Sequence, residues 1–435
     1  MTKPTPRHLE WAEMELGVII HYLMDIYNPE IDVSSSIERN AITKEFPASC
    51  FAPEGWDTDQ WMRSAAAMGA KYAVLVANHC TGFSLWPTKA NDYSVASCAY
   101  QDGKGDIIRD FLESCQKYNI KPGLYYSTGC NGYYGMNDFA EGVGDEYFQS
   151  DRYKEYVKVV EQQVLELWSE YGELFEVWFD GGVLPVEKGG PNLVPILEKY
   201  QPNTICFQGP KGFPHNVRWV GNEDGLAPAD CWGATNAGEA RFDGTVPDEQ
   251  AGVGDPDGKY FWPAETDMAN RDNKTASFGG WAWKEGEDHT AFSTEHLMDC
   301  YIRSVGRNSN LLMGMAIAAN GRFPDEEQFV QFGEAIRKTF GDEAILAQTG
   351  TTTETVQTLE LGAPKEINYI VLQEDMAEGH RIRRFRVTCD GEEVLCGQCV
   401  GHKRIIPCHK ENVSTVQVEI LESVETPVMR SIQIF

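Results

Sequence analysis

Between residues 10 and about 340, short apolar stretches alternate with amphipathic stretches of helical length, and this alternation constrains the fold most strongly. It is typical of βα units, which place parallel strands side by side in one sheet. The predicted strands cover 16–21, 72–77, 121–127, 175–180, 204–208, 217–221, 261–266 and 310–315. The predicted helices cover 57–68, 106–118, 151–171, 294–305 and 326–340. The pattern therefore predicts an α/β fold, a (β/α)8 TIM-like barrel.

The pattern changes after about residue 344. Short runs of alternating apolar and polar residues follow, separated by Gly, Pro and acidic turn residues, at 356–361, 367–372, 416–420 and 431–435. Such runs are typical of a small antiparallel sandwich. The sequence thus predicts a catalytic barrel over residues 1–343 and a C-terminal antiparallel β-sandwich over residues 344–435.

The formal net charge of −29 disfavours nucleic acid and anionic membrane surfaces as partners, because both carry negative charge. No apolar run approaches the roughly 18 residues of a membrane span. The first seven residues lack the apolar region of a signal peptide, which predicts a cytoplasmic protein unless a leader has been removed. The expected partner is an oligosaccharide or glycoconjugate substrate, and a homo-oligomer remains open.

Twelve cysteines are scattered along the chain at irregular spacing, which indicates reduced, mostly buried thiols. Cys396 and Cys399, flanked by Cys389 and Cys408, resemble a set of zinc ligands, but their spacings match no familiar ligand pattern. We therefore predict neither a metal site nor a cofactor.

Polar or aromatic residues stand at or just after the ends of several predicted strands. They are His21, His79, Tyr126, Asp180, Glu223 and Glu265. The carboxyl ends of barrel strands form the face that carries active sites in this architecture. We expect these side chains to meet there.

Asp180 ends an apolar strand and is followed by two glycines, so its carboxylate either works chemically or caps the next turn. Cleavage of a glycosidic bond needs two carboxyl groups. Glu223 is the preferred second carboxyl, and Glu265 competes with it. The alternative for either glutamate is a helix cap or an ion pair with a nearby arginine.

A series of ordered motifs then resembles the α-L-fucosidases of glycoside hydrolase family 29 over nearly the whole chain. The motifs are 17–21, 56–61, 69–72, 82–87, 103–106, 121–127, 177–181 and 305–312 in the barrel, with 371–375 and 401–404 in the sandwich. The resemblance implies a retaining exo-glycosidase that removes terminal α-L-fucose and needs no cofactor.

The same resemblance implies roles for single residues. Asp180 would be the nucleophile, and Glu223, in a Gly-Asn-Glu motif, would be the acid/base. That motif and Trp-Pro-Ala-Glu at 262–265 look like the branch acting on α-1,3/1,4-fucosyl linkages. A retaining pair predicts carboxyl groups about 5–5.5 Å apart. The expected substrate-binding residues are His21, Trp56, His79, Cys80, Tyr126, Trp178 and Arg271.

The predicted sugar-binding shell departs from the family pattern. Where the family has His-His-Asp, this chain has His79, Cys80 and Thr81. Where the family has a tryptophan directly after the histidine that ends the first strand, this chain has Tyr22. Cysteine is a weak hydrogen-bond donor and acceptor, so one contact to a sugar hydroxyl is weakened. Two alternatives follow: the same chemistry on a different α-L-configured or related sugar, or a non-catalytic glycan-binding barrel.

Overall fold

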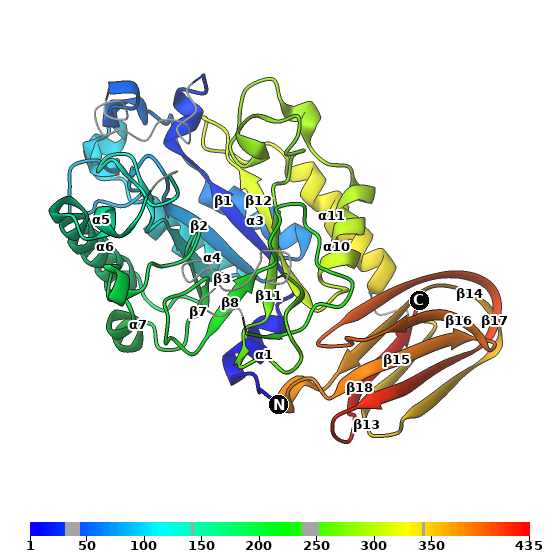
Figure 1. Ribbon diagram of the computed structural model, residues 1–435. Coiled ribbons are helices and arrows are strands. Elements are labelled where there is room, and N and C mark those ends of the chain that lie inside the picture. The colour runs from blue at the N-terminus through cyan, green and yellow to red at the C-terminus, as the bar shows by residue number, and fades with distance from the viewer. Residues whose placement is uncertain (31–43, 141–142, 237–251, 342–343) are drawn as a thin grey trace.

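The computed structural model describes residues 1–30, 44–140, 143–236, 252–341 and 344–435. Eight parallel strands form a closed barrel in the order β1-β12-β11-β8-β7-β6-β3-β2 (Figure 1). Their bounds are β1 Leu16–His21, β2 Tyr72–Asn78, β3 Lys121–Tyr126, β6 Glu176–Trp178, β7 Ile205–Phe207, β8 Asn216–Trp219, β11 Ala264–Met268 and β12 Ser309–Ala316. The predicted barrel is confirmed.

Helices lie outside the barrel and cover its strands (Figure 1). The longer ones are α3 Thr58–Met68, α4 Ile107–Tyr118, α6 Asp151–Glu170, α7 Val194–Tyr200, α10 Thr294–Ser304 and α11 Glu326–Phe340. Asp57 and Asp106 each accept a hydrogen bond from a backbone N–H in the first turn of α3 and α4. These caps explain why both helices begin where the sequence places them.

Strands β7 and β8 are neighbours in the barrel, yet no helix separates them in residues 208–215, which are described throughout. The segment contains Gly209, Pro210 and Gly212, and these residue types disfavour a helix. The backbone N–H of Cys206 donates to the carbonyl of His215 at 2.9 Å, so the chain returns directly into β8. The barrel thus departs locally from strict strand–helix alternation.

The C-terminal domain is an antiparallel β-sandwich with the strand order β13-β18-β14-β17-β15-β16. The strands are β13 Leu346–Thr352, β14 Val356–Glu374, β15 Ile382–Cys389, β16 Glu392–Gly397, β17 Arg404–Ser423 and β18 Met429–Ile434. The long strands β14 and β17 pair along their length with register shifts between residues 360 and 369. Because one half of the pair adjoins β18 and the other half β15, both layers share these strands.

The domain boundary follows from where regular structure ends and begins. Helix α11 ends at Phe340 and β13 begins at Leu346. We propose the division between residues 343 and 344, with each side containing its own apolar core.

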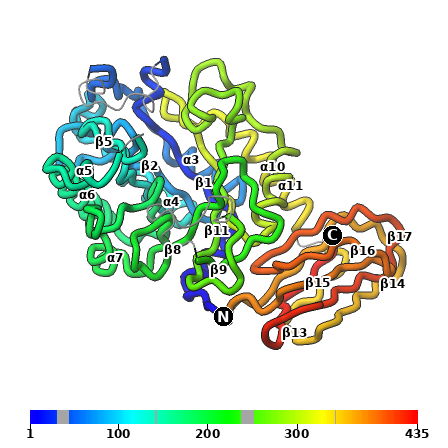
Figure 2. The backbone as a smooth tube through the Cα atoms, viewed as in Figure 1, coloured from blue at the N-terminus to red at the C-terminus, as the bar shows by residue number. Residues whose placement is uncertain are grey.

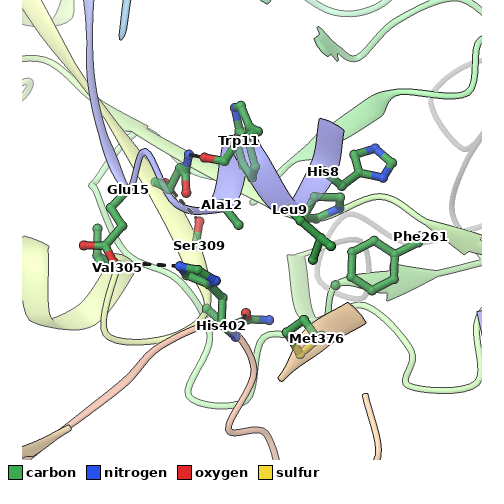
Figure 3. A pocket seen from close by; sticks show the side chains of 14 residues that line it. His8, Leu9, Trp11, Ala12, Glu15, Phe261, Val305, Ser309, Met376 and His402 are labelled. Carbon is green, nitrogen blue, oxygen red and sulfur yellow. Dashed lines mark hydrogen bonds and ion pairs between the residues drawn. The ribbon is translucent and has the colours of Figure 1, made fainter. Parts of the chain in front are cut away.

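The two domains meet at the amino-terminal end of the barrel. Helix α1 (Pro6–Ala12) lies there, and a cavity of about 30 Å³ separates it from the sandwich (Figure 3). His402 of the sandwich reaches toward Glu15 of the barrel, 3.9 Å away. Figure 2 shows the N-terminus beside the sandwich, where Lys3 forms an ion pair with Glu378.

The described residues contain neither a membrane-spanning helix nor a metal-binding cluster of side chains. No helix among them has the length and apolar character needed to cross a membrane. Nor do they contain three or more His, Cys, Asp or Glu side chains grouped as a metal site would require.

Candidate active site

A cavity of about 600 Å³ opens at the carboxyl-terminal ends of the barrel strands. This volume lies within the range of small-molecule sites. Residues from β1, β6 and β11 and from the loops after β2 and β8 line it. It therefore occupies the face on which enzymes of this architecture place their catalytic groups.

Asp180 stands in the turn that follows β6. The N–H of Gly182 donates to the carbonyl of Phe179 at 3.2 Å, and Gly181 and Gly182 have φ of 70° and 81°. This left-handed backbone favours glycine, which explains the paired glycines. The turn leaves the carboxylate half-buried in the cavity wall, where it accepts a 2.9 Å hydrogen bond from the Tyr125 hydroxyl.

Glu223 reaches the same cavity from the turn after β8. Gly221 begins this turn with φ of 98°, and the side chain of Asn222 donates to the carbonyl of Leu226 at 2.9 Å. The Glu223 carboxylate is exposed and accepts a 2.9 Å hydrogen bond from the Trp281 indole N–H. Asp180 and Glu223 therefore line one cavity from two different strands.

Four rings form a continuous stack across the mouth of the barrel. His79 lies against Tyr125 with ring centroids 5.7 Å apart, and Tyr125 lies against Trp178 at 5.3 Å. Trp178 in turn stacks on Phe207 at 3.9 Å. The stack comes from four neighbouring strands or their ends and provides an apolar wall beside Asp180, of the kind that suits the less polar face of a sugar.

The two cavity histidines have pKa values shifted in opposite directions. Burial, assisted by the nearby His79, lowers the pKa of His21 to about 3, so His21 is neutral. Burial also acts to lower the pKa of His79, but Cys80 and the carboxylates of Asp25 and Asp180 outweigh it and raise that pKa to about 9. The pKa values of the two imidazoles are thus shifted in opposite directions, and their ring centroids lie 6.2 Å apart.

Cys80 lines the cavity next to His79. Two causes raise the pKa of the Cys80 thiol well above its usual value: a hydrogen bond with Cys130, which has the larger effect, and burial. The thiol therefore keeps its proton at neutral pH. Thr81 is not among the residues that line the cavity, and its hydroxyl accepts a hydrogen bond from the N–H of Phe83 at 3.3 Å.

Glu265 occupies the barrel interior rather than the cavity wall. Its side chain is completely buried and accepts from the Tyr72 hydroxyl at 2.7 Å and from the Trp178 indole at 3.0 Å. Both oxygens are therefore occupied by protein donors. This arrangement leaves no surface for a glycosidic oxygen and disfavours the expectation that Glu265 competes as acid/base.

Three predicted substrate-binding residues lie outside the cavity lining. Tyr126 points out of the barrel and donates to Gln163 of α6 at 2.7 Å. Trp56 donates to Asp110 at 2.6 Å and packs on Tyr100. The guanidinium of Arg271 is buried between two carboxylates, which are those of Asp325 at 2.9 Å and Asp288 at 2.9 Å. His21, His79, Cys80 and Trp178 do line it.

The lining residues absent from the sequence-based set include Asp25, Tyr125, Asp267 and Trp281. Tyr125 lies on a predicted strand and Asp267 directly follows one, but alternation alone does not say which face of a strand points inward. Burial raises the pKa of Asp267 well above its usual value, against a hydrogen bond from Trp219 that lowers it. Asp25 belongs to a short 3-10 helix after β1 and Trp281 to the loop after β11, and neither gave a local signal.

The buried Glu265 predicts a pH-dependent stability. Burial raises its pKa from 4.5 to about 7, against hydrogen bonds from Tyr72 and Trp178 that lower it. Between these pH values the unfolded chain releases a proton that the folded chain retains. The free energy of unfolding should therefore fall by about 3 kcal/mol from pH 4.5 to pH 7 through this group alone.

Urea unfolding of the parent protein and of Glu265→Gln across this pH window measures the effect. The amide cannot titrate, so the variant's stability should fall less steeply. Glu285→Gln, at an exposed position, should leave the slope unchanged. Parallel curves for parent and Glu265→Gln would contradict the assigned titration.

The family model described as Alpha-L-fucosidase matches residues 10–331. The chain is 27% identical to Alpha-L-fucosidase 1 of Arabidopsis thaliana, covering 93% of this chain and 81% of that one.

Two solved structures extend the comparison. A crystal structure of a "putative alpha-L-fucosidase" from Bacteroides thetaiotaomicron has a TM-score of 0.90 and 32% identity, covering 100% of this chain and 99% of that one. A glycoside hydrolase 29 family member from an unknown rumen bacterium has a TM-score of 0.81 and 26% identity, covering 100% and 77%. The chain therefore belongs to the alpha-L-fucosidase family, glycoside hydrolase family 29, and is a glycoside hydrolase.

Proposed function

We propose that this chain removes terminal α-L-fucose from neutral glycans by a retaining mechanism. The observation that carries the proposal is that Asp180 and Glu223 line one cavity at the carboxyl-terminal face of the barrel. Family membership supports the reaction class. The α-1,3/1,4-fucosyl linkage is part of the proposal and rests on the Gly221-Asn222-Glu223 and Trp262–Glu265 motifs.

The first step has Glu223 as general acid and Asp180 as nucleophile. Glu223 gives its proton to the glycosidic oxygen, which leaves with the bonding electron pair. The Asp180 carboxylate attacks the anomeric carbon from the opposite face and forms a glycosyl ester. The Tyr125 hydroxyl, which donates a hydrogen bond to Asp180, orients that carboxylate for attack.

The second step reverses these roles. Glu223 removes a proton from water, the water oxygen attacks the anomeric carbon, and the ester bond to Asp180 breaks. Two inversions restore the α configuration of the released sugar. The stack of His79, Tyr125 and Trp178 would hold the sugar, with His21 and His79 reaching its hydroxyl groups.

The cavity walls also suit a neutral glycan. Five carboxyl groups line it: those of Asp25, Glu30, Asp180, Glu223 and Asp267. Those of them that are ionised repel sulfated or sialylated leaving groups. We therefore place neutral branched oligosaccharides among the preferred substrates.

Hydrolysis of 4-nitrophenyl α-L-fucoside and of a neutral Lewis-type trisaccharide tests the proposal. Both substrates should release fucose, and proton NMR should show the α anomer first. Initial release of the β anomer would contradict the retaining mechanism. Cleavage of the aryl fucoside without the trisaccharide would contradict the linkage assignment.

A second candidate keeps the chemistry and changes the sugar. It is favoured by Cys80, whose protonated thiol stands in the cavity where the family pattern has a histidine. A missing hydrogen bond to one hydroxyl changes selectivity by about 1–3 kcal/mol, or roughly ten- to a hundredfold. A panel of 4-nitrophenyl glycosides of α-L sugars separates the candidates, since a strong preference for fucose rejects this one.

A further inference from the structure

Trp281 contacts both the proposed proton donor and the sugar-binding side of the cavity. Its indole N–H donates to Glu223 Oε2 at 2.9 Å, and its ring lies 5.1 Å from the ring of His21. Trp281 also lines the cavity. Its ring packs over Gly314 of β12, where an added Cβ would lie 3.1 Å from the indole.

The loop that carries Trp281 is held in place by contacts that do not involve the substrate. The buried Arg271 joins its start to Asp325 and to Asp288 further along the same loop. The backbone N–H of Ser277 donates to Glu287 at 2.8 Å. The indole is therefore presented from a pre-formed loop.

The residues next to Glu223 in its turn do not fix the position of its carboxyl group in a comparable way. It is exposed at the tip of a turn, and the Asn222 side chain orders the backbone of that turn but not the Glu223 carboxyl group. A free glutamate side chain populates several rotamers in water. The indole N–H selects the rotamer in which Oε2 is held and Oε1 is left for the substrate.

We propose that Trp281 is a positioning residue that holds the Glu223 carboxyl group for proton transfer, an inference that rests on the proposed function. When Glu223 gives its proton from Oε1 to the glycosidic oxygen, negative charge develops on the carboxylate. The hydrogen bond to Oε2 strengthens as this charge forms. Trp281 therefore favours the transition state of the proton-dependent step.

The test compares Trp281→Phe with Trp283→Phe, a tryptophan two residues along the same loop. The substrates are a Lewis-type trisaccharide, whose leaving group needs a proton, and 2,4-dinitrophenyl α-L-fucoside, whose leaving group needs none. Trp281→Phe should lower kcat/KM for the trisaccharide about tenfold and leave the aryl fucoside within about twofold. Trp283→Phe should change neither by more than about twofold.

The pH profile gives a second readout. Without the N–H donor, the ionised form of Glu223 is less stabilised, so the alkaline limb of kcat/KM should move up by about 0.5–1 pH unit. Placing 3-benzothienylalanine, which keeps the ring shape without the N–H, at position 281 should reproduce both changes.

Several results would overturn the assignment. Equal losses on both substrates with an unmoved pH profile would indicate a packing role for Trp281. Parent-like behaviour of the benzothienyl variant would show that the N–H is not needed. A parent protein that cleaves neither fucoside overturns the proposed function and this inference together, whereas an active parent with unselective variants overturns this inference alone.

Discussion

Asp180→Ala is expected to lower kcat/KM for 4-nitrophenyl α-L-fucoside by about 10⁴-fold, the scale seen when a catalytic nucleophile is removed. The reason is that the variant lacks the carboxylate proposed to form the glycosyl ester, and the competing Glu265 is held by hydrogen bonds from Tyr72 and Trp178. The fold should be unaffected, since Asp180 is half-buried and accepts a hydrogen bond from the Tyr125 hydroxyl at the edge of the cavity.

Azide makes this test specific. In Asp180→Ala the small anion can enter the vacated space and attack the anomeric carbon directly, so the product should be β-L-fucosyl azide. Asp92→Asn is the matched control, because Asp92 also accepts a 2.9 Å hydrogen bond from a tyrosine hydroxyl but lies outside the cavity. Asp180→Ala with parent activity, or without azide rescue, would contradict the nucleophile assignment.

Glu223→Ala is expected to produce a different pattern. Its kcat/KM for a Lewis-type trisaccharide should fall by about 10²–10⁴-fold, the usual contribution of general acid catalysis. With 2,4-dinitrophenyl α-L-fucoside the first step needs no proton, so a burst of dinitrophenolate should precede slow turnover. Azide should accelerate the second step and yield α-L-fucosyl azide, because it attacks the ester on Asp180.

Two controls keep this result interpretable. Asp224→Asn removes the neighbouring carboxylate of the same turn and should retain the parent's leaving-group dependence. Glu265→Gln addresses the competing assignment. If Glu265→Gln gave the burst and α-azide while Glu223→Ala behaved like the parent, the proton donor would have to be reassigned.

The opposite configurations of the two azide products distinguish the carboxyl groups more sharply than rates do. Loss of activity in both variants could follow from any damage to the cavity. A β-azide from Asp180→Ala and an α-azide from Glu223→Ala require one attacking carboxylate and one proton-transfer group.

Much of the fold was accessible from residue patterns. Apolar runs and helical periodicity located the barrel strands, and the caps Asp57 and Asp106 marked the starts of α3 and α4. These signals are local, because they depend on backbone hydrogen bonding and burial within one segment. The loop between β7 and β8 followed a different course, since Gly209, Pro210 and Gly212 disfavour the helix that alternation implies.

The site was accessible only in part. Asp180 could be predicted as a site residue because a carboxylate after an apolar strand and before two glycines is locally unusual. No such local feature tells Tyr125, which lines the cavity, from its neighbour Tyr126, which does not. Strands buried on both faces carry apolar residues on each, so alternation gives two faces without saying which one points inward. Only barrel closure directs Tyr125 to Asp180 and Tyr126 to α6.

By itself, the sequence determined the barrel, the sandwich, the family and the strand end that carries Asp180, since each depends on neighbours along the chain. The tertiary structure decided which glutamate faces the cavity and which tryptophan touches it. Glu223 and Trp281 are 58 residues apart, and Glu265 and Tyr72 are 193 apart. Contacts over such separations form only when the closed barrel brings distant strand ends together.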